Sequence, residues 1–201
     1  MHARAEEAVL ARAARSTALP GDPGLWVFIL ADMGVFALLF LLFTLGRAGD
    51  VALYERSRHA LSAQLGLANT LILLTSSWTM VQAVHSARLG ERARTMRFLA
   101  VTMVVGAGFA ISKGFEYAGK AKAGLSMLTN DFFMYYFALT GLHFLHFAIG
   151  MAAIAVTLAK VRSEPSDGRL RVWIESVGCY WHMVDLLWIV LFPLLYLQRA
   201  A

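Results

Sequence analysis

One stretch near the start of the chain decides the fold: LWVFILADMGVFALLFLLFTL, residues 25–45. Its only charged residue is Asp32. A helix that crosses the hydrocarbon core of a bilayer needs about 20 mostly apolar residues, and this stretch has that length. It predicts a membrane-spanning helix.

Four further apolar stretches follow, at residues 60–84, 98–118, 132–159 and 172–198. The connections between the five stretches are too short to hold a soluble domain. We therefore expect an all-α integral membrane protein, a bundle of five transmembrane helices. The expected division is a cytoplasmic N-terminal tail at residues 1–24 and a transmembrane domain at residues 25–201, in which Pro193 bends the end of the last helix.

The composition agrees with a membrane protein. The 201 residues are 59% hydrophobic and only 15% charged, whereas soluble domains average about 25% charged residues. Cys179 is the only cysteine, which excludes an internal disulfide and a metal site built on paired cysteines. Residues 1–24 lack the apolar core of a signal peptide, so we expect the first span to be retained as an anchor.

The cations predict the orientation of the bundle. With the N-terminus inside, the inner segments hold eleven Lys and Arg residues and the outer segments hold seven. Inner loops of membrane proteins carry the excess of cations, so we expect the N-terminus inside and the C-terminus outside. The eleven are Arg4, Arg12, Arg15, Arg88, Arg92, Arg94, Arg97, Lys160, Arg162, Arg169 and Arg171; the seven are Arg47, Arg56, Arg58, Lys113, Lys120, Lys122 and Arg199.

Asp32 is a candidate for proton uptake. It lies about 10 Å inside the first span at 1.5 Å per residue, and an ionisable group inside a bilayer is costly unless it is paired or hydrated. One hypothesis is a carboxylate that takes up protons near the inner surface. The alternative is a buried, hydrogen-bonded or protonated acid that ties the first helix to a neighbour.

His143 and His146 are three residues apart, so they share one face of the fourth helix. A metal or haem site is one hypothesis, but two histidines so placed cannot occupy opposite axial positions of one haem. Hydrogen bonding between helices is the favoured interpretation, and we expect no metal site. Gly141 and Gly150 flank the pair and would let another helix approach closely.

The fifth helix carries a polar and aromatic cluster. Trp181, Asp185 and Trp188 fall on one stripe, with His182 beside Asp185. Together with His143 and His146, these residues form the expected interhelical polar cluster. We expect Asp185 to accept a hydrogen bond from His143, His146 or His182.

Lys113 and Glu116, three residues apart near the outer end of the third helix, predict a mutual ion pair. Phosphate-binding and dinucleotide-binding glycine motifs are absent, as is His-Glu-x-x-His. Three deep histidines are too few to hold two haems and a copper ion. The chain is therefore not the catalytic subunit of a haem-copper enzyme.

Four motifs resemble subunit III of the haem-copper oxidases: WVFILAD at 26–32, FEY at 115–117, TGLHFLH at 140–146 and YWHMVDLLW at 180–188. Within that family, LTSSW at 74–78 and IVLFP at 189–193 resemble the NorE-type proteins associated with nitric oxide reductases. The resemblance spans residue 20 to the C-terminus. The chain lacks the two additional N-terminal helices of the seven-helix form.

The resemblance implies a non-catalytic accessory subunit in the bacterial inner membrane, with no redox cofactor of its own. Haem and metal would lie only in the partner catalytic subunit of a nitric oxide reductase or cytochrome oxidase. A bound phospholipid, assembly, stability and support of proton uptake are the implied roles. Asp32 takes the position of the family's membrane carboxylate, which is often Glu.

Two alternatives stay open from the residues alone. Intramembrane Asp and His residues are typical of a small membrane transporter or ion carrier, although inverted repeats and midplane helix breaks are absent. A membrane cytochrome with histidine ligands is the other alternative. We expect no nucleic-acid partner, because the cations lie between apolar stretches rather than on one face.

Overall fold

The computed structural model describes residues 20–165 and 167–198, and this part of the chain is almost entirely helical. Five of its helices are long and apolar enough to cross a membrane, which confirms the predicted fold class. Residues 1–19 of the expected tail, with Arg4, Arg12 and Arg15, and also Arg199, lie outside the described residues. The elements are α2 (Pro23–Gly49), α3 (Val51–Arg58), α4 (Ala63–Arg88), α5 (Arg92–Lys122), α6 (Asp131–Ser163), α7 (Gly168–Phe192) and a π-helical turn η1 (Pro193–Leu197).

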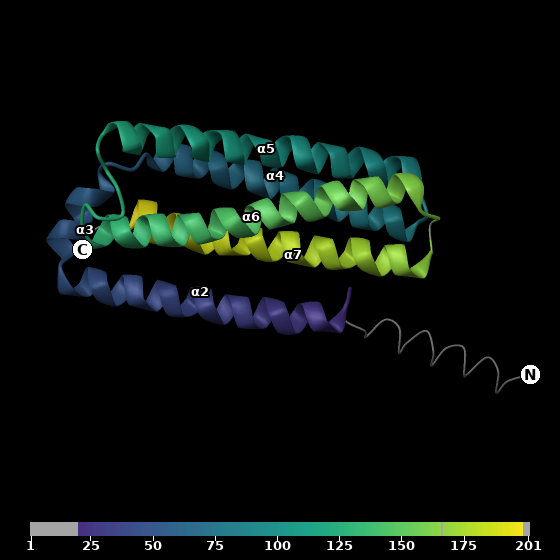
Figure 1. Ribbon diagram of the computed structural model, residues 1–201, viewed down its shortest axis with the longest axis horizontal. Coiled ribbons are helices and arrows are strands. Elements are labelled where there is room, and N and C mark those ends of the chain that lie inside the picture. Colours follow the sequence, from purple (N-terminus) through teal and green to yellow (C-terminus); the bar gives the residue numbers. More distant parts are fainter. Residues whose placement is uncertain (1–19, 166, 199–201) are drawn as a thin grey trace, which may run out of the picture.

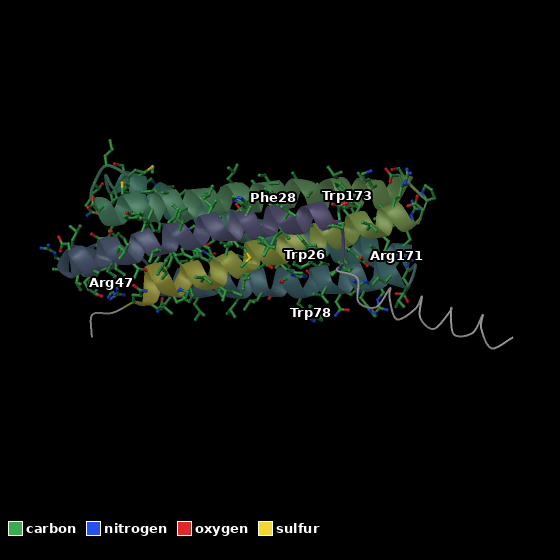
Figure 2. The ribbon with its side chains drawn as sticks, turned by 90° about the horizontal axis from the view of Figure 1, so that it is seen from below. Trp26, Phe28, Arg47, Trp78, Arg171 and Trp173 are labelled. Atoms are coloured by element: carbon green, nitrogen blue, oxygen red, sulfur yellow. The ribbon has the colours of Figure 1, made fainter. Side chains whose placement is uncertain are left out.

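The five long helices lie side by side along the long axis of the molecule, with α2 along one edge (Figure 1). We call the end where α2 begins and α4 ends the amino end. The opposite end, which holds α3 and η1, is the α3 end. Arg171 and Arg47 mark these two ends in Figure 2.

Three spans extend beyond the predicted apolar stretches at both ends, because polar flanks continue the helix past the hydrocarbon core. The other two extend at one end only: α4 begins three residues after the predicted start, and the last span ends at Leu197. The third span is the clearest case, predicted at residues 98–118 and observed at Arg92–Lys122. The segment 46–59, expected as a connection, is also largely helical. Asp50 ends α2 and begins α3, since its side chain accepts a hydrogen bond from the backbone N–H of Leu53 at 2.9 Å.

Side chains cap the starts of four of the five spans, whereas α5 begins after Glu91 without a side-chain cap. An Asp, Ser or Asn side chain accepts a hydrogen bond from a backbone N–H of the first turn, which satisfies a donor that the helix itself leaves free. These caps are Asp22 for α2, Ser62 for α4, Asn130 for α6 and Asp167 for α7.

Helix α7 is the buried centre of the bundle. Trp181 and Trp188 are both fully buried. Trp181 packs against two glycines, since a Cβ atom on Gly150 would lie 2.8 Å from its ring and one on Gly106 would lie 3.4 Å away. Gly150 therefore permits close approach, as expected. Gly141 does not serve that purpose, because nothing lies within 4 Å of its Cβ position.

Helix α2 is the least buried span. It contacts α6 and α7 through Ile29, Phe36 and Phe43, which recur every seven residues on one face. Large apolar side chains such as Val27, Leu30 and Leu38 remain exposed on its other faces. Such a surface suits contact with lipid or with another membrane protein.

Pro193 marks the end of α7. Proline has no backbone N–H, so it cannot donate the next hydrogen bond of an α-helix. The helix changes there from α to π geometry over Pro193–Leu197. This turn buries Leu195 and Tyr196. The predicted effect of Pro193 was a bend, and what the structure shows at this residue is the change to π geometry.

Candidate functional site

Five carboxyl groups belong to the span helices. Asp131 is the first residue of α6, and Glu175 pairs with Arg88 at the amino end. The other three are Asp32 in α2, Glu116 in α5 and Asp185 in α7. A buried charge is tolerated when it is paired or hydrogen-bonded. The partners of each carboxyl group therefore indicate what that group can do.

Glu116 lies at the α3 end and is saturated with partners. Its Oε2 atom accepts a hydrogen bond from Nζ of Lys113 at 2.8 Å, and its Oε1 atom accepts one from Nζ of Lys120 at 3.3 Å. The hydroxyls of Tyr136 and Tyr196 both donate to Oε1 at 2.8 Å. The predicted Lys113–Glu116 ion pair is thus part of a five-residue group, which we call the lysine cluster.

Lys113 is enclosed by aromatic rings as well. Its Nζ atom lies 5.2 Å from the ring centre of Trp188, 5.3 Å from that of Tyr117 and 5.4 Å from that of Tyr136. Ring faces attract a cation, and this attraction strengthens away from water. The lysine cluster joins α5, α6 and η1, which is a structural arrangement.

Asp32 contacts α6. Its Oδ1 atom lies 3.1 Å from Nε2 of His146, and the side chains are only 12% and 10% exposed. The other ring nitrogen of His146, Nδ1, lies 2.8 Å from the carbonyl oxygen of Leu142. Phe36 packs edge-on against the His146 ring at 5.5 Å. The pair joins the peripheral helix α2 to the bundle.

A hydrogen bond between Nε2 of His146 and Oδ1 of Asp32 requires one proton between these two atoms. A carbonyl oxygen only accepts, so Nδ1 of His146 must donate to Leu142. Nε2 then faces Asp32 either as the N–H of an imidazolium beside a carboxylate or as the acceptor of a proton on a neutral carboxyl group. In both of these forms, the two side chains together carry one proton more than a neutral histidine and an ionised carboxylate would carry.

His143 and Trp188 fill the centre of the bundle. Nε2 of His143 donates to the carbonyl oxygen of Val184 at 3.1 Å. The ring lies 5.6 Å from Phe109 and 5.2 Å from Trp188. The indole N–H of Trp188 donates to the Thr70 hydroxyl at 3.1 Å. These contacts connect α4, α5, α6 and α7.

Asp185 differs from the other two acids. It is 3% exposed, and neither carboxyl oxygen has a hydrogen-bond partner among the described residues. The expected hydrogen bond from a histidine to Asp185 is therefore wrong. His143 bonds to backbone and His146 bonds to Leu142 and Asp32, while Nδ1 of His182 bonds to the hydroxyl of Ser77 at 2.7 Å.

The histidines do not converge on a common point. Within residues 20–165 and 167–198, no three His, Cys, Asp or Glu side chains form a group suited to a metal ion. His143 and His146, although on one face of α6, contact different helices: His143 contacts α7 and His146 contacts α2.

Several partners lie outside the sequence predictions. Lys120 lies beyond the predicted span 98–118, although it follows Glu116 by four residues and Lys113 by seven, which puts all three on one helical stripe. That spacing could have identified it. The contacts of Tyr136, Tyr196 and Ser77 join distant parts of the chain, and no local pattern indicates them.

The described geometry can be compared with known proteins. The family model of cytochrome c oxidase subunit III matches residues 22–199. The cytochrome c oxidase subunit 3 of Corynebacterium diphtheriae is 28% identical over 175 residues, covering 86% of this chain and 85% of the relative. The cytochrome bo(3) ubiquinol oxidase subunit 3 of Pseudomonas putida and a probable quinol oxidase subunit 3 of Staphylococcus aureus are each 27% identical. They cover 87% of this chain and 84% and 87% of their own lengths.

Proposed function

The chain belongs to the cytochrome c oxidase subunit III family, and we propose that it is a non-catalytic accessory subunit of a haem-copper respiratory enzyme. The observation that carries this proposal is the match of the family model over all five spans. The same match favours an accessory subunit over the transporter and the membrane cytochrome. Any haem and metal would lie in the partner subunits.

The partner proposed first is an oxidase, because relatives that cover nearly the whole chain are named as oxidase subunits. A nitric oxide reductase is the second candidate, supported by the NorE-like segments at 74–78 and 189–193. Leu74, Trp78 and Ile189 from these segments are exposed on the outside of the bundle; Trp78 lies at its edge in Figure 2. Residues so placed are available to a partner.

The distribution of cations supports an N-terminus inside a bacterial inner membrane. Eight Lys and Arg residues lie at the amino end of the described chain and six at the α3 end. Lys113 and Lys120, two of the six, are buried against Glu116. Four cations remain at the α3 end against eight at the amino end, so leaving out the two buried lysines sharpens the asymmetry among the described residues.

A phospholipid fits a cavity at the amino end, between the start of α2 and the start of α7. Its volume is about 720 Å³, and its lining combines apolar side chains, such as Leu25 and Val172, with Trp173 and Arg169. Apolar walls suit an acyl chain, and an arginine suits a phosphate. Mass spectrometry of the purified chain should detect less phospholipid in Arg169→Gln than in the control Arg162→Gln; equal amounts would contradict this site.

The Asp32–His146 pair supports a role in proton uptake. It lies nearly buried at the contact of α2 and α6, where a hydrogen bond between the two side chains needs one proton. Asp32→Asn keeps the contact, because an amide N–H donates to Nε2 of a neutral histidine, but it removes the shared proton. We expect the assembled enzyme to keep its haem content and to take up protons more slowly. Unchanged proton uptake would exclude Asp32 from the path.

The accessory role is tested by mild-detergent purification with an affinity tag on Met1. We expect a haem-bearing partner to co-elute, and its haem and metal content distinguishes an oxidase from a nitric oxide reductase. A chain that elutes alone and colourless, from cells that make the enzyme, would contradict a stable subunit. Ion flux in liposomes containing only this chain would favour the transporter.

A further inference from the structure

A second polar path enters the bundle between α4 and α7, on a different face from Asp32 and His146. It begins in a cavity of about 250 Å³ at the amino end. The rim of the cavity carries the ion pair between Arg88 and Glu175, at 2.7 Å, and His85. Several water molecules fit this volume, each occupying about 30 Å³. The deepest polar side chain of its lining is His182.

His182 connects the cavity to the core. Its Nδ1 atom lies 2.7 Å from the hydroxyl of Ser77, which leaves Nε2 for water in the cavity. Ser77 is also the polar side chain that interacts with the carboxyl group of Asp185, although no hydrogen bond joins the two in this structure. Asp185 is three residues beyond His182 and therefore nearly one helical turn deeper.

The surroundings of Asp185 supply no charge to pair with it. From α4 it meets Ser77, which is the only polar side chain found to interact with it in the described part of the chain. From α6, His143 bonds to the backbone of Val184 instead. Lys113 of α5 is held by Glu116, and Asp32 of α2 is held by His146. An ionised carboxyl group without partners is too costly in such a place, whereas a protonated one is tolerated.

We propose that Asp185 is a proton-binding site in the core of the bundle, reached from the amino-end cavity through His182 and Ser77. This inference does not depend on the accessory role, since every group in the path belongs to this chain. The path is also separate from the Asp32–His146 pair.

The transfer balances as a relay of one proton. Nε2 of His182 takes a proton from water in the cavity, and Nδ1 passes its proton to Oγ of Ser77. Ser77 passes its own hydroxyl proton to the Asp185 carboxylate. The reverse transfers return the proton to the cavity. His182 and Ser77 end with the number of protons they had before. Asp185 gains one proton and the cavity water loses one, which bulk water at the amino end replaces.

Infrared spectroscopy of the purified full-length chain tests the proposal at neutral pH. We expect a protonated-carboxyl band that disappears in Asp185→Asn and persists in Asp32→Asn. A wild-type spectrum without any such band, or a band that Asp185→Asn leaves intact, would overturn the proposal.

The relay is tested by transferring the chain into D₂O and following the isotope shift of that band. Ser77→Ala and His182→Leu should slow the exchange about tenfold, the equivalent of one hydrogen bond lost from the path. The matched control is Ser76→Ala, because Ser76 is buried one residue away but bonds to the carbonyl of Thr102 in α5. Exchange at the same rate in Ser77→Ala and the wild type would refute the relay, even if Asp185→Asn fails to fold.

Discussion

Glu116 and Asp185 are both buried carboxyl groups in membrane-spanning helices, yet their surroundings are opposite. Glu116 has two lysines and two tyrosines as partners. Neither oxygen of Asp185 has a hydrogen-bond partner among residues 20–165 and 167–198. Burial alone therefore does not show what an acid in the membrane does. A saturated acid fixes helices in place, whereas an acid without partners is available for a proton.

The largest expected effect on stability comes from removing the charge of Glu116. Glu116→Gln leaves two buried ammonium groups without their counter-charge, which costs about 3–5 kcal/mol in the free energy of unfolding. Thermal unfolding in detergent measures the loss. The control is Glu164→Gln, which removes the partner of Lys160 in a more exposed ion pair and should cost at most about 1 kcal/mol. Equal losses of stability in both variants would mean that the lysine cluster stabilises the fold no more than an exposed ion pair does.

The packing around Asp185 gives the next effect. Gly150→Ala would place a Cβ atom 2.8 Å from the ring of Trp181, four residues before Asp185. Such overpacking costs about 1–3 kcal/mol. Gly141→Ala, on the same helix with nothing within 4 Å, should be neutral or slightly stabilising. If the two variants unfold at the same temperature, Trp181 does not fix the separation of α6 and α7.

Asp185→Asn should change the free energy of unfolding by less than about 1 kcal/mol, because it exchanges one neutral group for another of the same shape. Thermal unfolding under the same conditions as for Glu116→Gln gives the direct comparison. A loss as large as that of Glu116→Gln would show that Asp185 is charged and paired, which would remove the contrast between the two acids.

The smallest effect concerns Tyr54, a buried hydroxyl of α3 outside the spans that likewise has no partner in the described structure. Burial raises the pKa of Tyr54 to about 12, from the ordinary value of 10. The folded state therefore favours the neutral hydroxyl. The resulting stability is complete below pH 10 and is lost as the pH rises through 12.

Tyr54→Phe removes this titration. The variant should match the wild type in unfolding below pH 10 and lose less stability than the wild type between pH 10 and pH 12. Parallel losses of stability in the two proteins over that range would assign the alkaline effect to other groups.

The sequence predicted the five spans because each is a long apolar stretch, and helices in a bilayer follow length and hydropathy. It also predicted the Lys113–Glu116 pair, since partners three residues apart on one helix are a local pattern. The pairing of Asp32 with His146, and of Ser77 with His182, depends on how helices distant in sequence rotate against each other. The same limit explains the failed expectation for Asp185: sharing a stripe with histidines says nothing about the direction in which their nitrogens point.

In the proposed role, the chain supports a catalytic partner without carrying out the chemistry. The most direct measurement compares the purified enzyme with and without this chain for haem content, initial turnover and the number of turnovers before inactivation. We expect enzyme lacking the chain to keep its haem and to start active, with slower proton uptake, but to inactivate after fewer turnovers. An enzyme that has no activity from the first turnover, or one that lasts equally long without the chain, would contradict it.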